Sequence, residues 1–87
     1  MWSYMRKRRS NLEIYCRILE VVSGKGLGIS HIMREAGLRQ YQAESYLDYL
    51  VRKNMVARFG SDEVTIYRIR EKGKVALEDL ELMEKLS

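Results

Sequence analysis

The sequence contains one cysteine, Cys16, one histidine, His31, and no proline. A single cysteine cannot form an internal disulfide, and together with one histidine it supplies too few ligands for a zinc centre. A nucleophile, a base and an orienting group cannot be assembled from these residues either, so we expect no metal, no cofactor and no enzyme. Cys16 is expected to be a small buried apolar group.

Long apolar runs are also absent. No stretch approaches the roughly 20 apolar residues that a membrane-spanning helix needs. The basic run at residues 6–9 is followed by an amphipathic segment containing Glu13, Arg17 and Glu20, and not by the apolar core of a signal peptide. The 87 residues include no Pro-rich or Gly/Ser-rich linker, so we expect one cytoplasmic domain that makes no membrane contact.

What the chain does contain is unevenly distributed charge. Residues 1–70 carry 13 Lys and Arg against 7 Asp and Glu, a balance of +6, whereas residues 71–87 carry 3 against 5, a balance of −2. The basic part favours a polyanionic partner. We expect residues 1–9 to form a basic N-terminal arm, residues 10–70 a folded domain and residues 71–87 a C-terminal helix.

The first helix is predicted to begin at the segment Ser10-Asn11-Leu12-Glu13, which has the capping-box pattern. Apolar residues then recur at helical spacing, which indicates one buried face: Leu12, Tyr15, Cys16, Ile18, Leu19 and Val22. The glycines of "SGKGLG" end this helix. This segment lacks both phosphate-loop patterns and no strand precedes it, so we interpret it as a flexible connection.

Two further short helices are predicted on either side of Gly37. The first spans about residues 29–36, and Gly37 stands where a helix end needs a left-handed residue, with Leu38 placed to pack back on the helix. Helical spacing restarts in a new phase near Arg39, with an inward stripe of Ala43, Leu47, Leu50 and Val51. Short amphipathic helices joined by a glycine turn predict a helix-turn-helix, in which the second helix is offered to a DNA groove.

The segments after the third helix predict a hairpin and a last helix. Asn54 is a suitable left-handed stop. Residues 55–59 and 64–70 alternate in polarity around the turn at residues 60–63, as in a β-hairpin. The fold class is therefore mainly helical α+β, a winged helix-turn-helix with three helices, a two-stranded β-hairpin wing and a C-terminal helix. The apolar stripe of this last helix is our candidate homodimer interface: Leu77, Leu80, Met83 and Leu86.

Two spaced motifs also carry a family resemblance. Leu38, Gln42, Tyr46, Leu47, Leu50, Lys53, Met55 and Val56 match "LxxxQxxxYLxxLxxKGLI", and Tyr67, Ile69, Glu71, Lys72 and Gly73 match "YxLTEKG". Over residues 8–86 the chain resembles the small archaeal winged-helix DNA-binding proteins, although Asn54 and Arg70 replace the usual Gly and Thr. The resemblance implies a regulator or chromatin-like protein that binds double-stranded DNA, often dimerising through its C-terminal helix as an antiparallel coiled coil.

The expected DNA contacts fall into two groups. Candidates for base edges in the major groove are at the start of the third helix: Arg39, Gln40, Tyr41, Gln42 and Ser45. Candidates for phosphate contacts are the basic arm and the hairpin: Arg6, Lys7, Arg8, Arg9, Arg58, Arg68 and Arg70. Glu44 and Asp48 oppose phosphate on the same helix, so it cannot be the main source of attraction.

Three alternatives to a specific regulator remain open from the sequence. A nonspecific architectural DNA-binding protein would have the same charge pattern. A winged helix can also serve as a protein-protein interaction module, which the acidic residues of the third helix and of the wing tip favour. RNA is a further possible ligand. Among the tyrosines, Tyr41 and Tyr49 are expected to be exposed. Tyr15, Tyr46 and Tyr67 lie near apolar stripes and are expected to pack in or beside the core.

Overall fold

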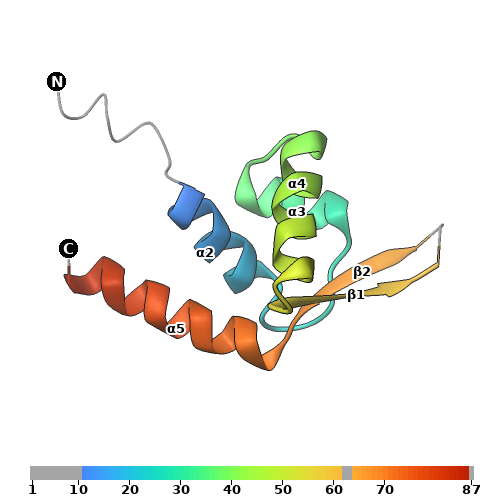
Figure 1. The fold of residues 1–87 in the computed structure, drawn as a ribbon. Helices are drawn as coiled ribbons and strands as arrows, with labels where there is room; N and C mark the ends of the chain where they lie inside the picture. Colours follow the sequence, from blue (N-terminus) through green and yellow to red (C-terminus); the bar gives the residue numbers. More distant parts are fainter. Residues whose placement is uncertain (1–10, 62–63, 87) are drawn as a thin grey trace, which may run out of the picture.

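A computed structural model describes residues 11–61 and 64–86, with side chains up to Leu82. Its elements are three helices, α2 (Asn11–Val21), α3 (Ile29–Ala36) and α4 (Gln40–Arg52), a hairpin of β1 (Val56–Gly60) and β2 (Thr65–Ile69), and α5 (Glu71–Leu86). The hairpin and α5 leave the helical core on opposite sides (Figure 1). This arrangement confirms the predicted α+β winged helix. The expected arm residues Arg6, Lys7, Arg8 and Arg9, the cap residue Ser10 and the side chains of Met83 and Leu86 lie outside the described part.

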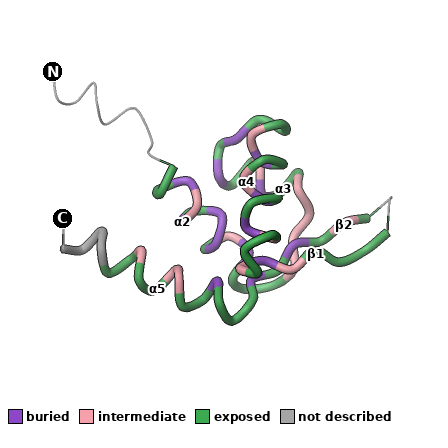
Figure 2. The backbone as a smooth tube through the Cα atoms, in the orientation of Figure 1, coloured by how far each residue is buried: buried purple, intermediate pink, exposed green. Residues whose placement is uncertain are grey.

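The core lies where α2, α3 and α4 meet the root of the hairpin. Its most deeply buried large side chains are Ile18, Leu19, Ile32, Leu47, Leu50, Val22 and Val56. In Figure 2 the buried positions face inward on all three helices, and the outer faces are exposed. Cys16 is buried as expected. Leu12 was expected on the buried face of α2, but it lies at the edge beside α5 and is 46% exposed. Ile14, which was not expected on that face, is buried.

The turn between α3 and α4 follows the prediction for Gly37. This residue is left-handed, with φ 67° and ψ 45°. The amide of Leu38 donates to the carbonyl of Met33 at 2.9 Å, which is the bond of a Schellman motif, and the Leu38 side chain is buried. Gly37 therefore stops α3 and sets the direction in which α4 begins.

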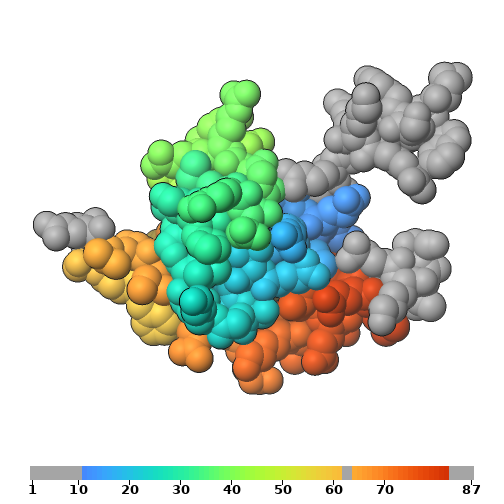
Figure 3. Space-filling view, turned by 180° about the vertical axis from the view of Figure 1, so that it is seen from behind, coloured from blue at the N-terminus to red at the C-terminus, as the bar shows by residue number. Residues whose placement is uncertain are grey.

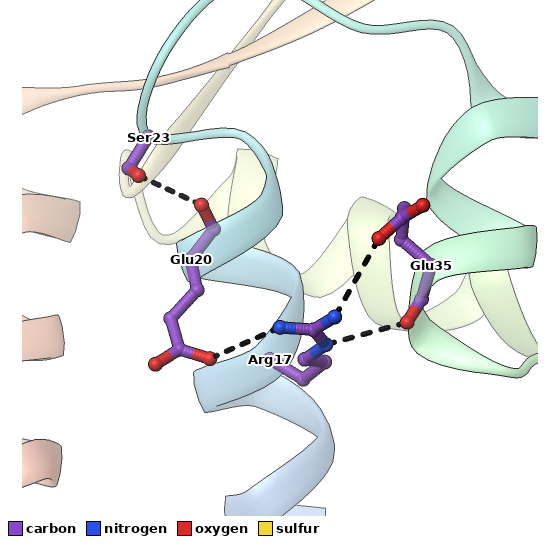
Figure 4. A network of polar contacts seen from close by, with 4 residues as sticks. All are labelled: Arg17, Glu20, Ser23 and Glu35. Atoms are coloured by element: carbon purple, nitrogen blue, oxygen red, sulfur yellow. Dashed lines mark hydrogen bonds and ion pairs between the residues drawn. The ribbon is translucent and has the colours of Figure 1, made fainter.

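A polar contact also connects α2 to the end of α3 (Figure 4). The Arg17 guanidinium donates from Nε to the backbone carbonyl of Glu35 at 3.3 Å, and lies 3.5 Å from its carboxylate and 3.7 Å from that of Glu20. The Ser23 hydroxyl donates to the carbonyl of Glu20 at 2.7 Å. Because the Glu35 carbonyl lies in the last turn of α3, Arg17 satisfies an acceptor left over at the helix end.

The hairpin is attached to the helices through the connection that follows α2. Leu27 and Tyr67 exchange both backbone hydrogen bonds, at 3.0 and 2.8 Å, and the amide of Ile69 donates to Val22 at 3.1 Å. The segment expected to be a flexible connection is anchored at Leu27, which forms a bridge with β2. Gly26 permits the approach, since a Cβ at this position would lie 2.3 Å from Cγ2 of Ile66.

The entry to α5 also depends on a close approach. Asn54 has φ 62°, the left-handed conformation expected for it. The carbonyl of Met55 then accepts from the amide of Arg70 at 2.9 Å, beside the first turn of α5. Figure 3 shows from behind that α5 continues along α2. The half-buried side chains of Ala76, Leu77 and Leu80 pack against the core.

The first prediction concerns Gly73. A Cβ here would lie 2.2 Å from the backbone oxygen of Met55 and 2.8 Å from Cγ1 of Ile69. G73A should lower the free energy of unfolding in urea by at least about 1 kcal/mol, despite the better helix propensity of alanine. The control G24A, with no atom within 4 Å of the added Cβ, should change stability by no more than about 0.5 kcal/mol. Equal stabilities of the two variants would contradict this account of the α5 attachment.

Candidate nucleic-acid interface

The outward face of α4 is set by what the helix buries. Its fully buried side chains are Ala43, Leu47 and Leu50. On the opposite side, Tyr41, Ser45, Asp48 and Arg52 are all exposed and follow one another at helical spacing. We call these four residues the α4 stripe. Arg52 was not among the residues expected to contact DNA, although its place four residues after Asp48 is visible in the sequence.

The start of α4 is organised by Gln42. The amide of Arg39, the residue that precedes the helix, donates to Oε1 of Gln42 at 3.0 Å, so Gln42 is the side-chain acceptor at the third position of the helix, as in a capping box. Gln42 is half-buried, while Arg39, Gln40 and Tyr41 are exposed. The oxygen of Gln42 is thus engaged within the protein. The Gln40 amide nitrogen donates to Oε2 of Glu44 at 3.4 Å.

The wing contributes three arginines. Arg58 on β1 forms an ion pair and hydrogen bond with the Asp48 carboxylate of α4, so the two elements are joined at their exposed sides. Its guanidinium also lies 5.4 Å from the centre of the Tyr67 ring. The hydrogen bond with Asp48 raises the pKa of Arg58 above its ordinary value. Arg68 and Arg70 are exposed on and beyond β2.

Two hollows lie next to each other between α4 and the wing, sharing Val51 and Arg58. One, of about 590 Å³, brings together Arg58, Arg68 and Arg70, three of the residues expected to contact phosphates. The other, of about 400 Å³, is lined by Ser45, Asp48, Val51, Arg52 and Arg58. Arg58, Arg68 and Arg70 thus border the larger hollow, and Arg52 and Arg58 border the smaller one. Arg58 and Arg68 lie on opposite faces of the hairpin, because Arg58 pairs with Tyr67 and Arg68 with Ala57.

The two acidic residues of α4 are held by partners in this region. Asp48 is paired with Arg58, and Glu44 accepts from Gln40. The Asp48 charge is thereby offset on the surface that the arginines line. The pair with Arg58 reduces the repulsion between Asp48 and a phosphate backbone, whereas the neutral partner of Glu44 leaves the charge of Glu44 in place.

A second, apolar surface lies between α2, α4 and α5. A hollow of about 370 Å³ is lined by Leu12, Tyr15, Leu19, Tyr49, Leu50, Met55, Ala76, Asp79 and Leu80. Of the stripe predicted for dimerisation, Leu77 and Leu80 are half-buried against their own domain. Val75 and Leu82, seven residues apart, are the more exposed apolar residues of α5, at 52% and 56%. The sequence analysis did not select them.

The tyrosines divide as expected. Tyr67 is buried, and Tyr15 and Tyr46 are half-buried and pack edge to face with ring centres 4.9 Å apart. The Tyr46 hydroxyl donates to Oδ1 of Asn11 at 2.8 Å. Burial is the main cause that raises the pKa of Tyr15. Tyr41 and Tyr49 are exposed, and Tyr41 belongs to the α4 stripe.

Other kinds of site find no support in the described part of the chain. Within residues 11–61 and 64–86, no three His, Cys, Asp or Glu side chains are grouped so that they could hold a metal ion. Over the same residues, no helix has both the length and the apolar character needed to cross a membrane. The arginine-lined side of α4 and the wing is thus the candidate site.

Three helices with a glycine turn, followed by a hairpin that packs on them, define a winged helix-turn-helix. The family model described as winged helix-turn-helix matches residues 8–87, so the chain belongs to this family. The solved structure of Sso10a-2, a DNA-binding protein from Sulfolobus solfataricus, is 31% identical with a TM-score of 0.83, covering 90% of this chain and 81% of that protein. The resemblance expected from the two motifs is confirmed. No curated protein matches the sequence.

Two transcriptional regulators share the fold at lower identity. BldR from Sulfolobus solfataricus is 21% identical with a TM-score of 0.75, covering 84% of this chain and 55% of that protein. A MarR family regulator from Silicibacter pomeroyi is 24% identical with a TM-score of 0.71, covering 90% and 57%. The chain spans little more than half the length of either regulator.

The second prediction tests the cap of α4. Q42A removes the acceptor of the Arg39 amide and should lower the free energy of unfolding by about 1 kcal/mol. For a domain of this size, the melting temperature should fall by about 4–8 °C. The control Q40A, whose side chain is exposed, should shift stability by less than about 0.5 kcal/mol. If both variants melt together with the unaltered protein, Gln42 does not cap α4.

Proposed function

We propose that the protein binds double-stranded DNA as a transcriptional regulator, with α4 in the major groove. The observation that carries this proposal is the exposed α4 stripe, which borders a hollow that Arg58 of the wing also lines. Arg39, Gln40, Tyr41 and Ser45 are the exposed candidates for base edges near the start of the helix. Gln42 belongs to this group through its amide nitrogen, because its oxygen serves the cap.

Phosphate contacts supply most of the affinity in this proposal. Arg68 and Arg70 reach the backbone from the wing, and Arg6, Lys7, Arg8 and Arg9 follow it from the N-terminal arm. These contacts carry no sequence information, so discrimination between duplexes comes from α4. The DNA-binding protein Sso10a-2 supports the choice of ligand, and BldR supports a regulatory role.

We also propose a homodimer through α5. Of the predicted stripe of Leu77, Leu80, Met83 and Leu86, the first two pack against their own domain. The exposed residues Val75 and Leu82, on the opposite side of α5, would therefore supply the contact with the second copy. A 16-residue helix gains most of its stability from packing, which a second copy of α5 supplies on the face left open. Two recognition helices would then reach half-sites about 34 Å apart.

An architectural DNA-binding protein is the second candidate function. The observation that favours it is the 31% sequence identity with the DNA-binding protein Sso10a-2. The two functions share the same surface and differ in whether α4 discriminates between sequences. A protein-protein interaction module is less well supported, because Asp48, one of the acidic residues that favoured it, is paired with Arg58 within the protein.

The third prediction measures DNA binding directly. Fluorescence anisotropy is recorded on a duplex from upstream of the gene and on a scrambled duplex, at 50–300 mM salt. About five phosphate contacts give a log-log salt slope near −4.5. R68Q and R70Q should each reduce the magnitude of this slope by about 0.9 on both duplexes.

The outcomes separate the candidate functions. Tighter binding to the upstream duplex supports a regulator, and equal salt-dependent binding to both supports an architectural protein. No binding to either duplex at 50 mM salt would contradict both and redirect the search to protein partners.

The fourth prediction concerns the dimer. L82E places a charge on the exposed face of α5 and should give a monomer by light scattering, with weaker DNA binding because paired half-sites are lost. The neighbouring exposed variant E81Q is the control and should leave the mass unchanged. Leu80 is less suitable, since it is half-buried and its replacement would also disturb the fold. A dimeric L82E protein would exclude this face as the interface.

A further inference from the structure

A notch separates α4 from the wing at the point where the α4 stripe meets β1. Its walls carry two guanidinium groups, from Arg52 and Arg58, the Ser45 hydroxyl and the Asp48 carboxylate. Ser45, Asp48 and Arg52 come from consecutive turns of the exposed side of α4, and Arg58 reaches over from the hairpin. The notch is thus a small polar hollow with a net positive charge.

Within the protein, the carboxylate of Asp48 is the ion-pair partner of Arg58. Arg58 keeps 42% and Asp48 59% of their side chains exposed, so the pair remains in contact with water. Exposed pairs of this kind are weak, because water and salt screen them and both side chains lose freedom. An arginine facing a phosphate gains in addition from counterion release. A phosphate group can therefore replace Asp48 as the partner of Arg58.

We propose that this notch binds one backbone phosphate of DNA through Arg52 and Arg58, and that Asp48 holds Arg58 until the phosphate replaces it. The inference rests on the proposed function and assigns one of its phosphate sites. In the complex, the two guanidiniums balance one phosphate and one carboxylate. Asp48 then lowers the affinity for every duplex alike, which leaves discrimination to the base contacts of α4.

Substitutions at the pair test this exchange by anisotropy on the scrambled duplex at 50–300 mM salt. D48N should bind about three- to tenfold more tightly, because Arg58 is free and a repulsive charge is gone. R58Q should bind more weakly and reduce the magnitude of the salt slope by about 0.9. In the R58Q background, D48N should increase the affinity for DNA by a clearly smaller factor, because it then removes only the repulsion between Asp48 and phosphate.

Two matched variants complete the test. E44Q removes an acidic charge from the same helix without freeing an arginine, so its gain should be well below that of D48N. R52Q should reduce the magnitude of the slope by about 0.9, as R58Q does, without touching the wing. Circular dichroism should show that all variants are folded, because every altered side chain is exposed.

Three results would overturn the inference. If D48N binds DNA no more tightly than the unaltered protein, no phosphate replaces Asp48 and the pair only positions the wing. If D48N and E44Q increase the affinity for DNA equally, and D48N increases it as much in the R58Q background as in the unaltered protein, Asp48 acts only through general repulsion. If R52Q leaves the slope unchanged, Arg52 does not contact a phosphate. Absence of binding by the unaltered protein would instead contradict the proposed function itself.

Discussion

The burial of one stripe of α4 is the constraint on which the candidate interface depends. Ala43, Leu47 and Leu50 are held in the core, and an α-helix is rigid enough that the opposite side is then determined. Tyr41, Asp48 and their neighbours in the α4 stripe are exposed for this reason. The polar surface is consequently a result of core packing, and its position does not depend on the polar residues themselves.

The wing is placed by backbone contacts. Leu27 pairs with Tyr67, and the amides of Ile69 and Arg70 bond to the carbonyls of Val22 and Met55. These bonds fix the root of the hairpin relative to α2 and α4, which brings Arg58 within reach of Asp48. In the proposed complex, affinity and selectivity come from different elements, since arginines line the wing and most candidate base contacts lie at the start of α4.

The sequence predicted the structure correctly where the conformation depends on residues that are close together along the chain. The left-handed turns at Gly37 and Asn54 and the order of the elements were predicted correctly, because local conformation and periodicity decide them. The Leu27 bridge and the Arg58 pair were not predicted, since each joins segments that are separated in the sequence. The cap role of Gln42 was missed because it requires the exact first residue of α4, which periodicity leaves uncertain by a few residues.

The central claim is that DNA contacts the arginine-lined side of α4 and the wing. The most direct test is a titration of the ¹⁵N-labelled protein with an unlabelled duplex, followed by amide and arginine side-chain NMR shifts. The account predicts that the largest changes occur at the α4 stripe, at Arg58 and at Arg68, while the amides of α3 change little. Shifts confined to the apolar hollow between α2 and α5, with α4 unaffected, would contradict it.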